Sequence, residues 1–425
     1  MQDILRPLCT SASLVALLAA PAIAATPADV AATYAGIAHA NYADSLATAH
    51  TLDAALEAFL ASPSAATHEQ AKEAWLAARV PYQQTEVFRF GNPIVDEWEG
   101  RVNAWPLDEG LIDYVETGLY GTSSDENPFY AVNIIANPVL NVGGETIDAS
   151  AIDASLLGAM HEIEEVEANV SRGYHAIEFL LWGQDLNGTG PGAGDRPWTD
   201  FALGADCTGG NCDRRRDYLA AASDLLITDL EEITASWADG GAARSDLTSG
   251  GADGGVARII TGLGSLSYGE LAGERMKLGL MLHDPEEEHD CFADNTHNSH
   301  FYNIVGMHNV YFGRYERADG NMVEGASLSD LVRASDPALD EAMRADLDTT
   351  LAAFTAIKTA ADEGHMAYDQ MLGEGNAEGN AMLQAAIDAL VAQTQTLERI
   401  VAALDLGQLA FEGSDSLDNP EAVFQ

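Results

Sequence analysis

The amino-acid sequence predicts an all-α protein built from helical bundles. Apolar residues recur at intervals of three and four along most of the chain, which is the pattern of amphipathic helices packed on a common core. Alanine is abundant in these stretches, and it has the highest intrinsic helix propensity. Alternating apolar and polar residues, the pattern of a half-buried strand, are scarce. A chain of 425 residues with 47% hydrophobic residues can form one large or two medium domains.

Seven segments carry the helical periodicity. The most regular lies near the C-terminus, where an apolar seam with near-heptad spacing runs from Leu383 to Leu404 and is interrupted by Thr394. A second seam runs from Leu219 to Trp237. In chain order, the predicted helices cover residues 28–61, 66–90, 150–182, 219–237, 256–282, 336–368 and 383–404.

Three segments between these helices lack the helical pattern. Residues 130–148 place Val and Ile among Asn and Gly, which predicts a short hairpin at most. Residues 187–195 are rich in glycine and predict an irregular connection. Residues 239–255 are mainly glycine and small polar residues, which is typical of a flexible loop or domain boundary. We therefore expect an N-terminal helical domain over 25–240 and a C-terminal helical domain over 256–425.

The first 24 residues have the organisation of a cleavable signal peptide. A short head with Arg6 precedes an apolar run over 14–20, and Ala-Ile-Ala at 22–24 forms a small-residue cleavage site. Cys9 precedes the apolar run, whereas the cysteine of a lipoprotein would follow it. Later apolar stretches are shorter than the roughly 18 residues needed to cross a bilayer. We expect an exported protein of the periplasm or cell envelope, with residues 1–24 removed and no membrane span.

The chain is strongly acidic, with a formal net charge of -47 at pH 7. Removal of residues 1–24 takes away one acid and one base, so the mature protein is equally acidic. Such a field repels nucleic acid and anionic lipid, and it attracts cations. Two explanations remain open: adaptation to a salty habitat, where charge maintains solubility, and a specific role in binding cations.

Three cysteines remain after the predicted cleavage. Cys207 and Cys212 flank the flexible sequence Thr-Gly-Gly-Asn, and they could close a small disulfide loop in an oxidising compartment. Cys291 would then be left over. The sequence does not determine which pair forms.

His175 and Glu178 are the first candidates for metal ligands. They lie within the predicted 150–182 helix in the sequence Gly-Tyr-His-Ala-Ile-Glu. A spacing of three places an imidazole and a carboxylate on one helix face, where they can share a metal ion or hydrogen-bond each other. His161 and Glu164 repeat the spacing in a charged stretch, roughly 20 Å away along a continuous helix. The two pairs therefore cannot share one ion.

A metal ion needs more ligands than one such pair supplies. We rank Glu86, in the predicted 66–90 helix, and Asp108, at a predicted helix start, as further ligand candidates. Structural alternatives are about equally open, namely an ion pair of Glu86 with Arg79 or Arg89, and an N-terminal cap formed by Asp108. The arginines of a chain with only 20 basic residues could also fix buried carboxylates or bind an anion.

Five of the 11 histidines fall between residues 283 and 308, beside several acidic residues. This segment is a second candidate metal region. His297 and His300 have the three-residue spacing of a helical pair, yet the sequence from Asp294 to Ser299 has the composition of a loop. The alternative to a specific site is weak binding of cations at the surface of an acidic, histidine-rich loop.

Several stretches of the chain resemble the imelysin-like family. The Gly-x-His-x-x-Glu sequence at 173–178 continues as Phe-Leu-Leu-Trp-Gly-Gln-Asp and is followed, after a glycine-rich loop, by Arg-Pro-Trp-Thr-Asp at 196–200. Trp-Leu-Ala-Ala-Arg-Val-Pro-Tyr at 75–82, Val-Asn-Ala-Trp-Pro-Leu-Asp-Glu at 102–109 and Ser-Leu-Ser-Tyr-Gly-Glu at 265–270 extend the match. The segment 290–300 resembles the iron-regulated protein A-like branch, so the resemblance covers nearly the whole mature chain.

This resemblance implies two four-helix-type bundles that pack together, with a functional cleft between them near the helix that carries residues 173–178. It also implies a role tied to iron acquisition, although some members of the family are described as peptidases. The residues expected at the cleft in addition to the four ligand candidates are Arg79, Glu270, Arg275, His297 and His300.

Three functions follow from these observations. The first is an exported protein that binds a metal ion or a small iron-containing ligand in the cleft and works with other envelope components in iron uptake. Iron is the expected ion, with zinc or calcium as alternatives. The second is a metallopeptidase of the imelysin type, although the sequence has no H-E-x-x-H, H-x-x-E-H or G-x-S-x-G motif. The third is a helical scaffold in which His175 and Glu178 bond only each other.

The sequence leaves several properties open. These are the identity of the ion or ligand, the presence of peptidase activity, the uptake partner and the oligomeric state.

Overall fold

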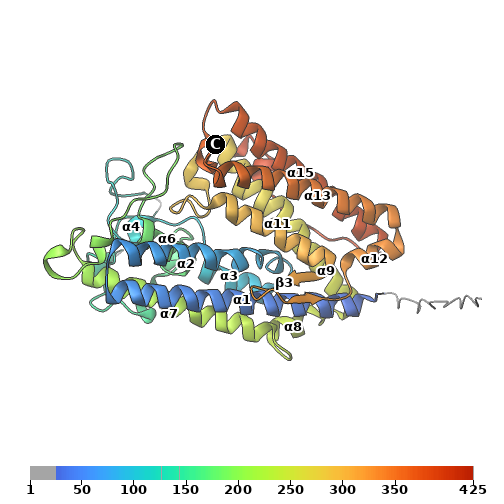
Figure 1. Ribbon diagram of the computed structural model, residues 1–425, viewed down its shortest axis with the longest axis horizontal. Coiled ribbons are helices and arrows are strands. Elements are labelled where there is room, and N and C mark those ends of the chain that lie inside the picture. The colour runs from blue at the N-terminus through green and yellow to red at the C-terminus, as the bar shows by residue number, and fades with distance from the viewer. Residues whose placement is uncertain (1–24, 126, 143, 425) are drawn as a thin grey trace, which may run out of the picture.

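The computed structural model describes residues 25–125, 127–142 and 144–424, so the predicted signal peptide lies outside the described residues. The described chain is mostly helical, and its strands form two short antiparallel pairs (Figure 1). The prediction of an all-α fold is confirmed. The hydrophobic core is continuous and receives side chains from both ends of the sequence.

One group of helices is built around the N-terminal helix α1 (Pro27–Ala61). A capping box starts α1, because the Thr26 hydroxyl accepts a hydrogen bond from the Asp29 amide and the Asp29 carboxylate accepts one from the Thr26 amide. Helix α1 packs along α2 and α7, and α6 packs against α2, α3 and α7. The bounds of these partners are α2 Ala65–Gln83, α3 Pro93–Asn103, α6 Gly173–Trp182 and α7 Cys212–Trp237.

A second group contains the helices of the C-terminal part, which lie above the first group in the view of Figure 1. Helix α9 continues without interruption into a π-helix, η5, and then into α10, while α15 packs on α13 and η5. Contacts of α1 with α9 and of α2 with α11 join the two groups. The bounds are α9 Gly251–Ser265, η5 Leu266–Lys277, α10 Leu278–Leu282, α11 Thr296–Phe312, α13 Pro337–Asp362 and α15 Ala377–Ala403.

Short elements connect these helices. The predicted hairpin in 130–148 is confirmed, with Val139 opposite Asp148, whereas a second hairpin of three-residue strands was not predicted because such short strands leave no alternating pattern. The short elements are α4 (Glu109–Ile112), β1 (Val139–Val142), β2 (Glu145–Asp148), α5 (Ala154–Met160), α8 (Ala242–Leu247), β3 (Arg314–Glu316), β4 (Met322–Glu324), α12 (Leu328–Ser335), α14 (Tyr368–Leu372) and α16 (Asp415–Asp418).

The continuous helix predicted over 150–182 is wrong. Helix α5 ends at Met160, and the backbone then turns through the left-handed region at Glu162, Glu164 and Glu165 before α6 begins at Gly173. These residues belong to a dense run of acids whose mutual repulsion disfavours a helix, and left-handed backbone cannot continue one. His161 and His175 therefore do not lie on one helix, and the distance of roughly 20 Å that a continuous helix would give between them does not apply.

Two predicted loops contain helix. Residues 239–255 hold α8 and the first turn of α9, and α11 begins at Thr296 inside the predicted turn. Glycine and asparagine lower intrinsic helix propensity, but tertiary packing overrides this small cost, because Ser299 and His300 are buried on α11. The predicted helix 66–90 also ends early, at Gln83, and is followed by a 3-10 turn over Glu86–Phe88.

Cys207 and Cys212 form a disulfide with their Cα atoms 6.1 Å apart, and Cys291 is buried as a free thiol. The disulfide closes the loop in front of α7. In the part of the chain that the structure describes, no helix combines the length and the apolar character needed to cross a membrane.

Candidate metal centre

The glycine of the Gly-x-His-x-x-Glu sequence determines how α6 begins. Gly173 has a φ of +84°, and a Cβ atom at this position would lie 2.6 Å from the carbonyl oxygen of Val102. Only glycine therefore allows the chain to turn into α6 so close to the end of α3. Within the first two turns of α6, His175 and Glu178 extend into the protein interior, and both are fully buried.

His175, Glu178 and Asp290 form a cluster with the geometry of a metal site. One potential ligand atom from each residue lies within 4.8 Å of the others. Nδ1 of His175 is 2.9 Å from Oε2 of Glu178 and 3.7 Å from Oδ1 of Asp290. The structure thus keeps together the two residues predicted from their spacing and adds Asp290 from the segment that precedes α11.

Arg79 holds Asp290 in place. Its Nε and Nη2 donate to the two Asp290 carboxylate oxygens at 3.1 and 2.6 Å, and its Nη1 donates to Oδ1 of Asn103 at 2.7 Å. The Asn295 side chain donates a further bond to Asp290 at 2.8 Å. A bidentate guanidinium fixes a carboxylate in one orientation, so the predicted cleft residue Arg79 is a positioning residue of this centre.

The protonation states of the helix pair follow from burial. Burial lowers the pKa of His175 well below its ordinary value, and the charges of Arg79 and Arg275 lower it further, so the imidazole is neutral and able to bind a metal. Burial and the neighbouring Asp290 raise the pKa of Glu178 well above its ordinary value. The backbone N–H of Ala293 donates a hydrogen bond to the Glu178 carboxylate, which opposes this rise. A bound cation would take the place of the proton on Glu178.

Two aromatic rings separate this centre from a cavity. The Trp105 ring lies 4.9 Å from the His175 ring, and the His289 ring lies 5.7 Å from it, between ring centroids. Both Trp105 and His289 line the cavity, whose volume is about 740 Å³. The cluster of His175, Glu178 and Asp290 therefore lies directly behind the wall of this cavity.

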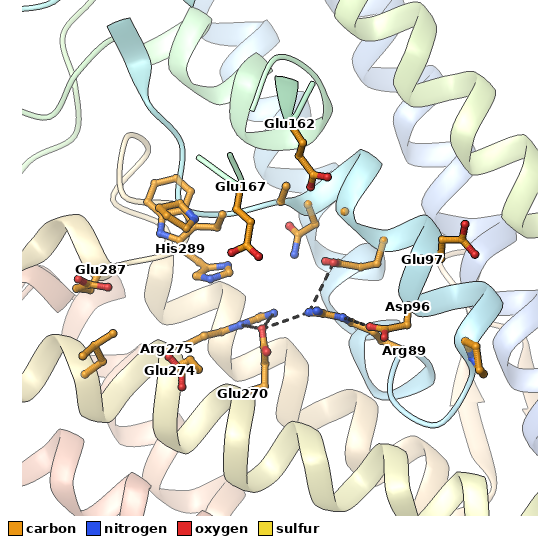
Figure 2. Close-up of a pocket in the computed structure, with 18 residues that line it drawn as sticks. Arg89, Asp96, Glu97, Glu162, Glu167, Glu270, Glu274, Arg275, Glu287 and His289 are labelled. Carbon is orange, nitrogen blue, oxygen red and sulfur yellow. Dashed lines mark hydrogen bonds and ion pairs between the residues drawn. The ribbon is translucent and has the colours of Figure 1, made fainter. Parts of the chain in front are cut away.

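The cavity is acidic, as Figure 2 shows. Carboxylates from α3, from the segment between α5 and α6, and from η5 surround it, and only two arginines balance them. Such an arrangement favours cations over anions. Its charged lining residues are Arg89, Asp96, Glu97, Glu99, Glu162, Glu167, Glu270, Glu274, Arg275 and Glu287.

Three of the predicted site residues meet at one ion-pair network beside the cavity. Nη2 of Arg275 lies 2.6 Å from Glu86 and 2.6 Å from Glu270, and Arg89 approaches Glu270 at 3.4 Å. Glu86 is thus paired with Arg275, and not with either arginine considered as its alternative partner. Because Arg275 occupies one Glu86 oxygen, the structure places this carboxylate in the network and outside the metal cluster.

The remaining predicted residues lie at other places. Asp108 is the N-cap residue of α4, but its side chain makes no capping bond and accepts from Asn127 instead. His297 lies on α11 and pairs with Asp362 at 3.2 Å, whereas His300 is buried with its ring 5.3 Å from that of Tyr368. None of these three belongs to the cluster formed by the described residues.

Sequence reasoning missed Asp290 as a ligand. It named the segment 290–300 and the nearby histidines, but the carboxylate that reaches His175 is the first residue of that segment. A signal was present in the resemblance, because the segment begins with Asp290. Sequence spacing could not indicate Asp290 as a ligand, because its position depends on contacts between distant segments. The residue that holds it, Arg79, is 211 positions away in the sequence.

The residues present fit a transition-metal ion. One imidazole and two carboxylates form a mixed nitrogen and oxygen donor set that suits iron or zinc. Nε2 of His175 is buried and has no hydrogen-bond partner among the described residues, so no neighbouring group fixes the ring by its second nitrogen. Arg79 donates two hydrogen bonds to the Asp290 carboxylate and so orients it toward His175 and Glu178.

Comparison with known proteins places the chain in a family. The sequence model of the imelysin family, Peptidase M75, matches residues 38–397. The iron-regulated protein A of Synechococcus elongatus is 24% identical over 374 residues, which cover 86% of this chain and 82% of that protein.

Two solved structures share the fold. A candidate iron-regulated protein A precursor from Parabacteroides distasonis superposes with a TM-score of 0.62 at 19% identity, over 90% of this chain and 97% of the other. An imelysin-like protein from Psychrobacter arcticum superposes with a TM-score of 0.52 at 16% identity, over 91% of this chain and 99% of the other. The family match extends from α1 to α15 and contains every residue of the candidate metal centre, so this chain belongs to the imelysin family.

Proposed function

We propose that this protein is an exported metal-binding protein of the cell envelope. It holds one metal ion, with iron as the first candidate, at His175, Glu178 and Asp290. The observation that carries the proposal is the buried cluster whose three ligand atoms lie within 4.8 Å of one another. A neutral imidazole and two carboxylates in the protein interior are costly unless they are paired or bind a cation.

The acidic cavity supports a free cation as the ligand. Eight carboxylates and two arginines line it, so an anionic iron chelate would meet repulsion, whereas a hydrated cation would be concentrated beside Trp105 and His289. Trp105 and His289 lie between the cavity and the cluster, because both line the cavity and both contact the His175 ring.

The choice of iron rests on the names of the relatives, because the donor set suits zinc as well as iron. The relative from Synechococcus elongatus is named an iron-regulated protein A. Export rests on the signal-peptide organisation of residues 1–24. Together these observations support a role in iron uptake, in which the protein would pass its ion to other envelope components.

A metallopeptidase is the second candidate function. The family carries a peptidase designation, and a cavity of about 740 Å³ adjoins the cluster. Glu99 lines this cavity, and burial together with Glu86 raises its pKa to about 7 against the opposing charge of Arg89. A carboxylate with a pKa near 7 is suited to general base catalysis.

The test is calorimetric titration of tag-free mature protein with ferrous, ferric and zinc ions, using wild type, His175→Ala and the surface control His365→Ala. We expect one ion per chain in wild type and the control, and an affinity at least about 100-fold lower in His175→Ala, because the imidazole is one of three ligands. Equal, weak binding at many sites in all three proteins would show that surface charge alone binds the ions.

A parallel assay distinguishes the two functions. Metal-loaded protein is incubated with an unfolded protein substrate such as casein, and new amino termini are counted. Cleavage that is lost in His175→Ala but kept in His365→Ala would favour the peptidase, whereas stoichiometric binding without cleavage supports the uptake role.

A further inference from the structure

A polar pocket lies between α2 and α11, which belong to the two groups of helices seen in Figure 1. Its volume is about 240 Å³, several times the roughly 30 Å³ that one water molecule occupies in the liquid. None of the described residues that line it carries a carboxylate, although the chain has 67 acidic residues. The polar lining residues are Arg79, Gln83, Asn295, Asn298, Ser299 and Tyr302.

The hydrogen-bond network fixes the orientation of the Gln83 amide. Arg275 donates to Oδ1 of Asn303 at 3.3 Å, so Nδ2 is the Asn303 atom left to bond Gln83. This Nδ2 donates to Oε1 of Gln83 at 3.0 Å and to the Gln83 carbonyl oxygen at 2.8 Å. Nε2 of Gln83 then has no hydrogen-bond partner among the described residues, although the residue is fully buried. A ligand in the pocket that Gln83 lines can pair with this group.

Ser299 adds a second unpaired donor on the facing helix. The residue is fully buried, and its hydroxyl has no hydrogen-bond partner in the part of the chain that the structure describes. Ser299 lies one turn before Asn303 on α11, and residues at this spacing share one helix face. Because Asn303 bonds Gln83, the Ser299 hydroxyl lies on the side of α11 that faces α2.

The amide oxygens of the lining residues are already engaged. Oδ1 of Asn295 accepts a hydrogen bond from Asn298, and Oδ1 of Asn298 accepts one from Lys358. The hydrogen-bonding capacity that remains therefore consists of N–H and O–H donors. Buried donors without an acceptor are costly, and the oxygen atoms of a ligand would satisfy them.

The charges around the pocket admit an anion. Two carboxylates bond residues at the pocket, and each has a cationic partner, since Asp290 is paired with Arg79 and Asp362 with Lys358. The first turn of α11 borders the pocket, and its N-cap residue makes no side-chain capping bond, so positive partial charge at this helix end is available. Acids farther away are largely screened, because the screening length at physiological ionic strength is about 8 Å.

We propose that this pocket binds a small oxyanion, either inorganic phosphate or a carboxylate, through the Gln83 amide and the Ser299 hydroxyl. These donors match the acceptor oxygens of such a group. A metal cation is disfavoured, because neither a carboxylate nor an imidazole is among the described residues that line the pocket.

The pocket adjoins the candidate metal centre. Two of its lining residues, Arg79 and Asn295, donate hydrogen bonds to Asp290. The acidic cavity reaches the same cluster by way of Trp105 and His289. The anion site does not rest on the proposed function, because its unpaired donors are present whether or not a metal ion binds.

The proposal is tested by calorimetric titration of chelator-stripped mature protein with sodium phosphate, sodium acetate and glycerol at constant ionic strength. We expect saturable binding of one anion per chain and no binding of glycerol, which offers oxygen atoms without negative charge. The anion that binds more tightly identifies the source of the oxyanion. Saturable binding of neither anion, or binding of glycerol as tight as that of the anions, would overturn the proposal.

Two substitutions test the donors. Gln83→Glu keeps an oxygen for Asn303 but replaces the unpaired Nε2 by a second oxygen, so the anion affinity should fall at least about tenfold through repulsion. Gln70→Glu is the matched control, since it adds the same charge at an exposed position of the same helix. Ser299→Ala should lower the affinity about 3- to 10-fold, the effect of one lost hydrogen bond. Ser245→Ala, exposed on α8, is its control.

Ser299→Ala decides the question if Gln83→Glu does not fold. Its hydroxyl bonds no described group, so circular dichroism should show an intact fold. Equal anion affinity in wild type and Ser299→Ala would overturn the proposal. His175→Ala should bind phosphate or acetate as wild type does, so failure of the metal site leaves the anion site measurable. Loss of the anion in His175→Ala would place the anion elsewhere and refute the assignment to this pocket.

Discussion

The residue that organises the candidate metal centre is Arg79. Its side chain is 1% exposed, it makes a bidentate ion pair with Asp290, and its guanidinium lies 4.9 Å from the centre of the Tyr174 ring. A buried ion pair contributes little net stability, but removal of one partner leaves the other charge unpaired in the interior. Asp290 would in that case face Glu178 without a compensating cation.

Arg79→Met should therefore destabilise the metal-free protein strongly. We expect the free energy of unfolding to fall by about 3–5 kcal/mol, measured by urea denaturation followed by circular dichroism. Arg333→Met is the matched control, since Arg333 is half exposed in its pair with Asp330 and its removal should cost at most about 1 kcal/mol. Similar losses in the two variants would contradict the assigned role of Arg79.

At the scale of the elements, two irregular helices position the site. Helix α6 begins at Gly173, where the backbone is left-handed and lies against Val102. The π-helix η5 carries Glu270 and Arg275, which bond each other at 2.6 Å although they are five residues apart. In an α-helix, residues at this spacing would point about 140° apart, so the wider π-helical turn brings the pair to one face.

Gly173→Ala tests the start of α6. The new methyl group would meet the Val102 carbonyl oxygen at 2.6 Å in a backbone conformation that alanine disfavours. We expect a loss of about 2–4 kcal/mol in the free energy of unfolding, from strain and from the clash. Gly36→Ala in α1 meets nothing within 4 Å and should instead stabilise the protein by about 0.5–1 kcal/mol. A neutral effect of Gly173→Ala in urea denaturation would refute this account.

At the scale of the whole molecule, buried acids determine the pH dependence. Burial and the negative charge of Glu286 raise the pKa of Glu109 to about 8. Burial also raises the pKa values of Asp369, Glu286 and Glu99, to about 7 to 8. The unfolded chain loses these protons near pH 4, so the folded protein binds more protons than the unfolded chain up to about pH 8. The free energy of unfolding therefore decreases as the pH rises through this window.

Histidines have the opposite effect at lower pH. Burial lowers the pKa of His68 and of His161 to about 4, so both are neutral in the folded protein while the unfolded chain protonates below about pH 6.5. Their contribution to stability is lost as the pH falls from 6.5 to 4, and it offsets the gain from the acids there. The window above pH 6.5 is governed by the carboxylates.

The melting temperature should accordingly be higher at pH 6.5 than at pH 8.5. The measurement is scanning calorimetry in EDTA at constant ionic strength, since divalent cations would replace the protons of the buried acids. Glu109→Gln should reduce the difference, because glutamine does not ionise. A melting temperature that rises from pH 6.5 to 8.5 would show that these carboxylates do not titrate in this range.

The sequence by itself determined the helical class, most of the long helices and the pairing of His175 with Glu178, because periodicity and spacing within one helical turn are local properties. Local patterns could not reveal the break before Gly173, the helix that begins at Thr296, or the pairing of Glu86 with Arg275. Only the tertiary structure brought Asp290 to His175, because that contact depends on how distant helices pack and on a buried guanidinium that holds the carboxylate in place.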